Sequence, residues 1–141
     1  MDRRSFLGTL AGGVAVGLAG CESQAAGNYD VGMTLRRFRP AVLHVTPGTT
    51  VVWKNTSGRA HTVTAYEDRI PDGADFFASG GFESEAAARQ GWVGSRGGAI
   101  FEGDTYEHTF DVRGQYTYFC VPHEPSGMIG TVVVGDATET N

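Results

Sequence analysis

Near the end of the chain lies the stretch Tyr118-Phe119-Cys120-Val121-Pro122-His123-Glu124-Pro125-Ser126-Gly127-Met128. Within it a thiol, an imidazole and a thioether follow one another as Cys120, two residues, His123, four residues, Met128. Tyr118 shares the alternation parity of Cys120, which predicts a strand that ends at the thiol. The stretch therefore presents three soft or borderline donor side chains from one connection between strands.

The same connection is predicted to be stiff. Pro122 and Pro125 each fix their own φ and restrict the residue before them, which biases the segment away from helix. Gly127 permits a sharp backbone turn that directs Met128 back toward the other two donors. A stiff connection of this kind keeps the donor side chains in place when a metal ion bound by them changes its charge.

This donor set is typical of a copper site in an electron carrier. A thiolate and two imidazoles in a trigonal plane, with a long axial thioether, suit both Cu(II) and Cu(I), because soft sulfur favours Cu(I) and imidazole serves both. The loop supplies Cys120, His123 and Met128, and a second imidazole must come from elsewhere. We expect it from His61, which follows a turn containing glycine and begins a predicted strand.

Outward from this stretch, the chain is predicted to be all-β. Short alternating segments separated by turns such as Pro47-Gly48 and Arg113-Gly114 indicate about seven strands. We place them at 29–35, 41–46, 50–55, 61–66, 105–112, 115–120 and 129–134. One long insertion, 67–104, interrupts the pattern and contains a short helix over 85–90, with Ser84 as N-cap and Gly91 as its stop. Its aromatic side chains predict that the insertion packs against the strands: Phe76, Phe77, Phe82, Trp92 and Phe101.

Length and composition limit the classes of fold and function that the chain can have. The 141 residues, 40% hydrophobic and 19% charged, amount to one folded domain, and 21 glycines favour the many turns of an all-β fold. Eleven basic against sixteen acidic side chains give a formal charge of −5, which argues against binding nucleic acid. No apolar run reaches the roughly 18 residues of a membrane span, and two cysteines are too few for a disulfide framework.

The first residues are predicted to direct export. Arg3-Arg4 precede a short, glycine-rich apolar stretch, which indicates a signal peptide over 1–20 of the twin-arginine type. Leu18-Ala19-Gly20-Cys21 is typical of a lipoprotein cleavage site before Cys21. We therefore expect a lipidated Cys21, a linker over 21–28, a domain over 29–135 and a tail over 136–141, anchored to the outer face of the cell membrane. A disulfide between Cys21 and Cys120 is the alternative.

The chain resembles the cupredoxins, the single-domain blue (type 1) copper proteins, and most closely their plastocyanin and halocyanin branch. The resemblance spans Val31 to Val134 and rests on Val52-Trp53-Lys54-Asn55, His61-Thr62-Val63 and the ending Tyr-x-Tyr-Phe-Cys-x-x-His, Gly-Met-x-Gly-x-Val-Val-Val. It implies a Greek-key β-sandwich. It also implies one copper ion, with His61, Cys120 and His123 as equatorial ligands and Met128 as the axial ligand.

The implied function is one-electron transfer between membrane-associated redox partners by a monomer, with the edge of His123 as the exit route, and not catalysis. Copper storage or delivery through the same ligands is the alternative, and a Cys120 nucleophile activated by His123 is a weaker one because nothing supplies an oxyanion hole. The chain departs from many plastocyanins at Phe119, Thr62 and Val121, where tyrosine, asparagine and a hydroxyl residue are common.

Other polar residues receive ordinary structural interpretations. His44 and His108 have no cysteine or methionine at ligand spacing, so we expect structural or surface roles. The acidic side chains of the insertion form either a solvated face or a docking patch for a cationic partner: Glu67, Asp68, Asp72, Asp75, Glu83 and Glu85.

Overall fold

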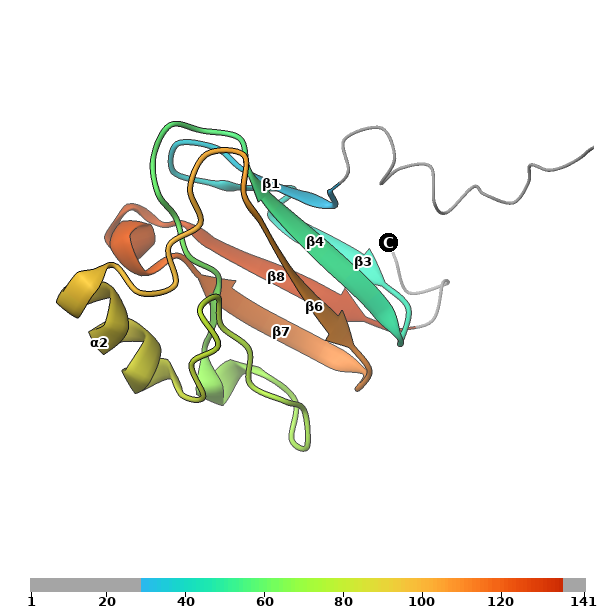
Figure 1. Cartoon of the computed structure of the whole chain (residues 1–141). Coiled ribbons are helices and arrows are strands. Elements are labelled where there is room, and N and C mark those ends of the chain that lie inside the picture. The colour runs from blue at the N-terminus through green and yellow to red at the C-terminus, as the bar shows by residue number, and fades with distance from the viewer. Residues whose placement is uncertain (1–28, 136–141) are drawn as a thin grey trace, which may run out of the picture. The chain divides into compact units, whose positions relative to one another are not determined.

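Two four-stranded β-sheets stack face to face in the computed structural model, which describes residues 29–135 (Figure 1). The first sheet has the order β2 (Phe38–Arg39), β1 (Val31–Met33), β4 (Thr49–Asn55) and β6 (Thr105–Phe110). The second has the order β3 (Val42–Val45), β8 (Ile129–Val134), β7 (Gly114–Phe119) and β5 (Thr64–Ala65). Two pairs, β1 with β4 and β3 with β8, are parallel, and the others are antiparallel. The predicted all-β sandwich is confirmed.

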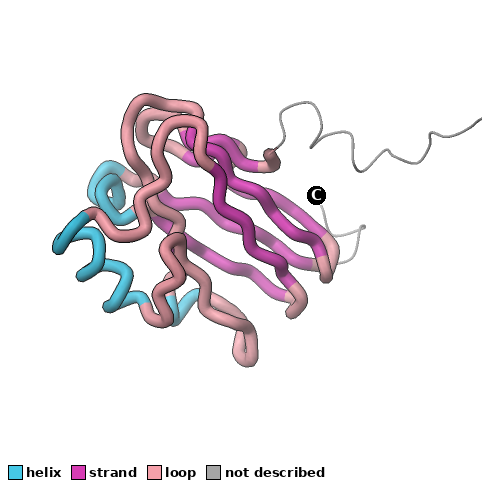
Figure 2. Tube along the Cα trace, in the orientation of Figure 1, coloured by secondary structure: helices cyan, strands magenta, loops and turns pink. Residues whose placement is uncertain are grey.

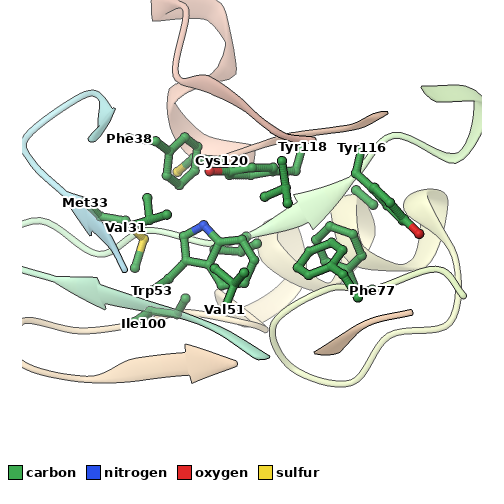
Figure 3. Packing of buried hydrophobic residues seen from close by; sticks show 14 of the residues in the cluster. Val31, Met33, Phe38, Val51, Trp53, Phe77, Ile100, Tyr116, Tyr118 and Cys120 are labelled. Atoms are coloured by element: carbon green, nitrogen blue, oxygen red, sulfur yellow. The ribbon is translucent and has the colours of Figure 1, made fainter. Parts of the chain in front are cut away.

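Aromatic side chains from both sheets fill the space between them. Trp53 of β4 is fully buried and meets Tyr118 of β7 edge to face, with ring centroids 5.4 Å apart. Phe110 of β6 meets Tyr116 in the same manner at 4.9 Å. Cys120, which follows the last residue of β7, is fully buried and packs in this core (Figure 3), so the thiol lies at the junction of the core and the loop.

The insertion between β5 and β6 packs on the sandwich, as its aromatic residues predicted. It contains η1 (Glu67–Arg69) and α2 (Glu85–Ser95). Phe77 is buried in the core, where its ring stacks on His108 at 4.5 Å. Phe101 is the exception, because 51% of its surface is exposed.

The helix is longer than predicted. Ser84 is its N-cap, with the hydroxyl oxygen accepting a hydrogen bond from the Ala87 N–H at 3.1 Å, as expected. Gly91 does not end it, and the chain remains helical as far as Ser95. A side chain at Gly91 would collide with the Phe82 ring, so this glycine provides room for packing inside the helix. The C-cap is Arg96, which takes the left-handed conformation with φ 61°.

One strand was missed in the sequence, and another is shorter than predicted. The pair Phe38–Arg39 forms β2, which is too short to show alternation in the sequence. The strand expected over 61–66 shrinks to Thr64–Ala65, because the backbone of His61 pairs with Ile100 of the insertion instead of a strand of the sheet. His61 therefore stands in an isolated bridge at the edge of the sandwich.

The prediction of a non-helical ligand loop was also wrong. Residues Val121–Ser126 form a 3₁₀ helix, η2, with Pro122 in its first turn, where a missing N–H leaves no hydrogen bond unmade. Gly127 closes it with φ 90°, as expected of a sharp turn. Helices α2 and η2 lie side by side at one end of the sandwich (Figure 2).

The predicted signal peptide, the lipidation site at Cys21, the linker and the tail lie outside the described residues. No helix among residues 29–135 is long and apolar enough to cross a membrane.

Candidate metal centre

Three donor side chains from distant parts of the chain meet at the end of the sandwich that carries η2. His61 comes from the bridge to Ile100, Cys120 follows the last residue of β7, and His123 lies in η2. Their ligand atoms all lie within 4.8 Å of one another. Two of the three side chains are buried, and His123 is partly exposed.

The triangle formed by these atoms has the size that a metal ion requires. The two Nδ1 atoms lie 3.2 Å apart, and Cys120 Sγ lies 3.6 Å from Nδ1 of His61 and 3.4 Å from Nδ1 of His123. A point equidistant from the three atoms is about 2.0 Å from each, close to the distances of about 2.0–2.3 Å at which imidazole nitrogen and thiolate sulfur bind metal ions. The donor set fits copper.

Met128 is brought to the same place by the backbone. Its carbonyl accepts a hydrogen bond from the Cys120 N–H at 3.1 Å, and its N–H donates to the His123 carbonyl at 3.2 Å. The side chain is fully buried. The turn at Gly127 thus ties Met128 to both Cys120 and His123, the two other donors of the loop.

A buried polar network sets the tautomer of His61. The Ser57 hydroxyl donates to Asn55 Oδ1 at 2.9 Å, with the Arg59 carbonyl as a more distant acceptor at 3.4 Å, and its oxygen lies 3.1 Å from Nε2 of His61. The hydroxyl oxygen must then accept from Nε2–H, which leaves Nδ1 unprotonated and facing the other donors. Asn55 is anchored in turn by donating to the Ile100 carbonyl at 2.8 Å.

Thr62 holds the thiol residue from two sides. Its backbone N–H donates to Cys120 Sγ at 3.4 Å, and its hydroxyl oxygen accepts from the Val121 N–H at 2.8 Å. The first bond stabilises negative charge on sulfur, and the second fixes the start of η2 against the bridge segment. Thr62, at a position where asparagine is common in similar proteins, therefore still links the segment that carries His61 to the segment that carries Cys120.

Burial controls the protonation of all three donors. It raises the pKa of the Cys120 thiol to about 11, against the smaller opposing effect of hydrogen bonds from Thr62 and His123. Burial, followed by the positive charge of His123, lowers the pKa of His61 to about 4. The pKa of His123 is lowered by burial and then by the guanidinium groups of Arg59 and Arg36. At neutral pH the metal-free centre therefore holds two neutral imidazoles and a thiol, and a metal ion must displace the thiol proton.

An ion-pair network links the insertion to η2, and the sequence did not reveal it. Arg89 of α2 reaches Glu124, the neighbour of His123, at 2.7 Å, and the Tyr66 hydroxyl donates to the same carboxylate at 2.6 Å. The Arg89 hydrogen bonds hold the pKa of Glu124 below its ordinary value. The guanidinium also lies 4.3 Å from the centroid of the Phe119 ring, on which Tyr66 stacks. Arg89 and Glu124 are 35 positions apart in the sequence, so only the folded structure shows that they form an ion pair.

The remaining predicted residues stand elsewhere. His44 and His108 are not members of the metal-binding cluster among residues 29–135, in agreement with the structural roles expected of them. Among the acidic side chains of the insertion, Glu85 pairs with Arg89, which also binds Glu124. Glu67 and Glu85 accept hydrogen bonds from each other's backbone N–H groups, at 3.2 and 3.1 Å. Cys120 is a free thiol.

Comparisons with known proteins point in the same direction. Residues 25–135 match the family described as copper binding proteins, plastocyanin/azurin family. The chloroplastic plastocyanin of Tetradesmus obliquus is 32% identical over 127 residues, which cover 88% of this chain and 78% of the relative. The plastocyanin of Scenedesmus fuscus is 33% identical over 97 residues, 69% of this chain and 85% of the relative. The crystal structure of amicyanin from Paracoccus versutus aligns with a TM-score of 0.53 and 26% identity, over 74% of this chain and 78% of that one.

Proposed function

Since the chain belongs to the plastocyanin/azurin family of copper-binding proteins, we propose that it carries single electrons on one copper ion held by His61, Cys120, His123 and Met128. The observation that carries the proposal is the triangle of two nitrogens and one sulfur, whose size already suits a metal ion. Copper, when bound, supplies a one-electron Cu(II)/Cu(I) redox couple, and sulfur and imidazole donors can bind the ion in both oxidation states. The membership of a halocyanin branch stays a prediction.

The protein's part in this function is to keep the donors still. The imidazole of His61 is fixed by Ser57, Cys120 is fixed by Thr62, and η2 is fixed to α2 through Glu124. When ligand positions are set by the surrounding fold, little rearrangement accompanies a change of charge, and electron transfer is fast. A rigid centre of this kind also disfavours the easy release that copper delivery requires.

His123 is the route by which electrons reach the surface. It is the one nitrogen donor with exposed surface, while His61 is fully buried. Val121 and Pro122 beside it are half-buried, and Pro125 is exposed. A redox partner placed against this ring comes within one side chain of the metal position.

The location of the protein belongs to the same proposal. Export through the signal over residues 1–20, followed by lipidation of Cys21, places an electron carrier at the outer face of the cell membrane, next to membrane-associated donors and acceptors. The support is the pair Arg3-Arg4 and the sequence Leu18-Ala19-Gly20-Cys21. Mass spectrometry of the native protein tests it, since a diacylated N-terminal Cys21 is expected and an intact Met1 contradicts it.

Repeated redox cycling tests the carrier function. The copper-loaded full chain is reduced with ascorbate and reoxidised with hexacyanoferrate(III), each step moving one electron per protein. We expect the copper absorption to vanish and return over many cycles with the copper content unchanged. Loss of copper to a weak chelator within seconds of reduction would instead support delivery, and a copper signal that does not respond to either reagent contradicts both functions.

A further inference from the structure

Five exposed arginines gather around the end of the molecule that carries His123, and we call them the arginine rim. Three of them line a surface depression of about 380 Å³ that η2 borders through Ser126: Arg36, Arg37 and Arg39. The other two line a depression of about 290 Å³ that includes Pro122 and the His123 side chain: Arg59 and Arg96. The rim therefore flanks η2 on both sides of the electron route.

The charges of the rim are not neutralised within the described part of the chain. None of the five guanidinium groups forms an ion pair there. Arg96 lies 5.6 Å from the ring centroids of both Trp92 and Phe101, which leaves its charge in place. The carboxylate nearest to His123 in sequence, Glu124, is occupied by Arg89. Glu102 and Asp104, in the loop before β6, are exposed acids near Asn55 at this end.

Three acidic side chains lie at the opposite end of the sandwich, where Arg69 and Arg113 lie too, while Glu85 and Glu124 at the η2 end are paired with Arg89. Strand β7 runs six residues from Gly114 to the ligand loop, a length of about 20 Å. Pro71 packs against Gly114 at its far end, and Asp72 follows directly. Asp75 and Asp111 line a depression at that end as well. The five exposed arginines therefore give the surface around His123 a positive charge of its own, although the formal charge of the chain is −5.

Apolar surface accompanies the charges. Leu35, which lines the first depression together with the rim residues, exposes 56% of its surface, and Pro125 of η2 is exposed as well. An apolar centre with charged residues around it is the usual make-up of a specific protein interface. Free inorganic anions require no such apolar surface.

We propose that the arginine rim is the docking surface for a one-electron redox protein whose own contact face is acidic. The inference rests on the proposed electron-carrier function and adds to it the chemistry of the partner. Opposite charges bring the two faces together quickly and orient the His123 edge toward the partner's redox centre. One electron then passes from the reduced protein to the partner, or in the opposite direction when the partner is the donor, with no bond made or broken.

The electrostatic part of the proposal is tested with two small oxidants of opposite charge. The copper-loaded full chain, in neutral detergent, is reduced and then mixed with the hexacyanoferrate(III) anion or the tris(phenanthroline)cobalt(III) cation. We expect oxidation by the anion to slow as salt is added, although the net charge of the protein is negative. If salt accelerates that reaction, the net charge governs the encounter and the proposal is overturned. If neither oxidant restores the copper absorption, the carrier function itself fails.

Matched variants locate the effect. Arg36→Gln with Arg59→Gln should slow oxidation by hexacyanoferrate(III) roughly three- to tenfold at low salt, with the copper spectrum unchanged. Arg113→Gln removes a charge near the far end of β7 and should leave that rate nearly unchanged. Equal effects of the rim variant and the Arg113 variant would overturn the proposal.

Two further probes identify the class of partner. A glutamate decapeptide, standing for an acidic protein face, should inhibit oxidation of the unchanged protein by hexacyanoferrate(III) and leave the rim variant unaffected. Vesicles of phosphatidylglycerol, compared with phosphatidylcholine, test for a membrane surface instead. Rim-dependent binding to the anionic vesicles, without inhibition by the peptide, would assign the rim to lipid and overturn the protein partner.

Discussion

At the scale of single residues, Ser57 determines how well His61 can bind a metal. Its hydroxyl oxygen accepts from Nε2–H and keeps Nδ1 free for the ion. We expect Ser57→Ala to lower the affinity for copper by roughly 10- to 100-fold, the usual effect of removing a hydrogen-bond partner of a ligating histidine. Competition with a chelator measures it, and Ser126→Ala, at an exposed position of η2, is the control. Equal affinities of the two variants would show that the tautomer is set elsewhere.

The protonation of His61 predicts a pH dependence for the metal-free protein. Its pKa of about 4 in the fold lies below the ordinary 6.5, so the unfolded chain binds a proton over this interval while the folded chain does not. The contribution of His61 to the free energy of unfolding is therefore fully present above pH 6.5. It falls as the pH drops toward 4, by on the order of 3 kcal/mol. Urea unfolding at a series of pH values measures the slope. His61→Gln should reduce the slope and His44→Gln should not, with a remaining slope because the pKa values of His108 and His123 are lowered as well. An unchanged slope in His61→Gln contradicts the assignment.

At the scale of elements, α2 and η2 act as one unit. Arg89→Met keeps the length of the side chain and removes the ion pairs with Glu124 and Glu85. Because Arg89 is partly exposed, we expect a loss of only about 1 kcal/mol in the free energy of unfolding. The more specific result is faster hydrogen exchange of backbone amides in η2. Arg96→Met, at the end of the same helix, is the control, and identical exchange in both variants would mean that the ion pairs do not hold η2.

The pairing of β7 with β8 depends on a glycine. Gly130 lies opposite Tyr118, and a Cβ at Gly130 would fall 2.5 Å from the Tyr118 hydroxyl oxygen, inside the core. Overpacking of this kind costs about 1–3 kcal/mol, which we expect for Gly130→Ala in thermal or urea unfolding. Gly58→Ala, where a Cβ meets nothing within 4 Å, is the matched control. A Gly130→Ala protein as stable as that control would show that Tyr118 moves aside freely.

The elements also show which features a sequence can predict. Alternation located the long strands, and Ser84 located the start of α2, because both signals are local. The end of α2 was wrong because Gly91 serves the Phe82 ring, and the bridge at His61 was missed because Ile100 lies 39 positions away. The spacing around Cys120 identified the donors for the same local reason. The residues that orient those donors, such as Arg89, depend on contacts between segments far apart in sequence.

At the scale of the whole molecule, the sandwich unites segments that carry no common local signal. Its two sheets hold the bridge after β4 and the loop after β7 at one end, and Cys120 packs there against the aromatic core (Figure 3). The same arrangement gathers the arginine rim around the copper end, while Asp75 and Asp111 line a depression at the other end. A negatively charged protein can in this way meet an acidic partner.

The most direct test of the central claim is the absorption and electron paramagnetic resonance spectrum of the full chain after addition of one equivalent of Cu(II). Coordination by His61, Cys120, His123 and Met128 predicts an intense thiolate-to-copper charge-transfer band in the visible range and a narrow copper hyperfine splitting. Cys120→Ser should lose the band while the sandwich stays folded. A colourless protein with an ordinary tetragonal copper signal, or a band that survives in Cys120→Ser, would contradict the account.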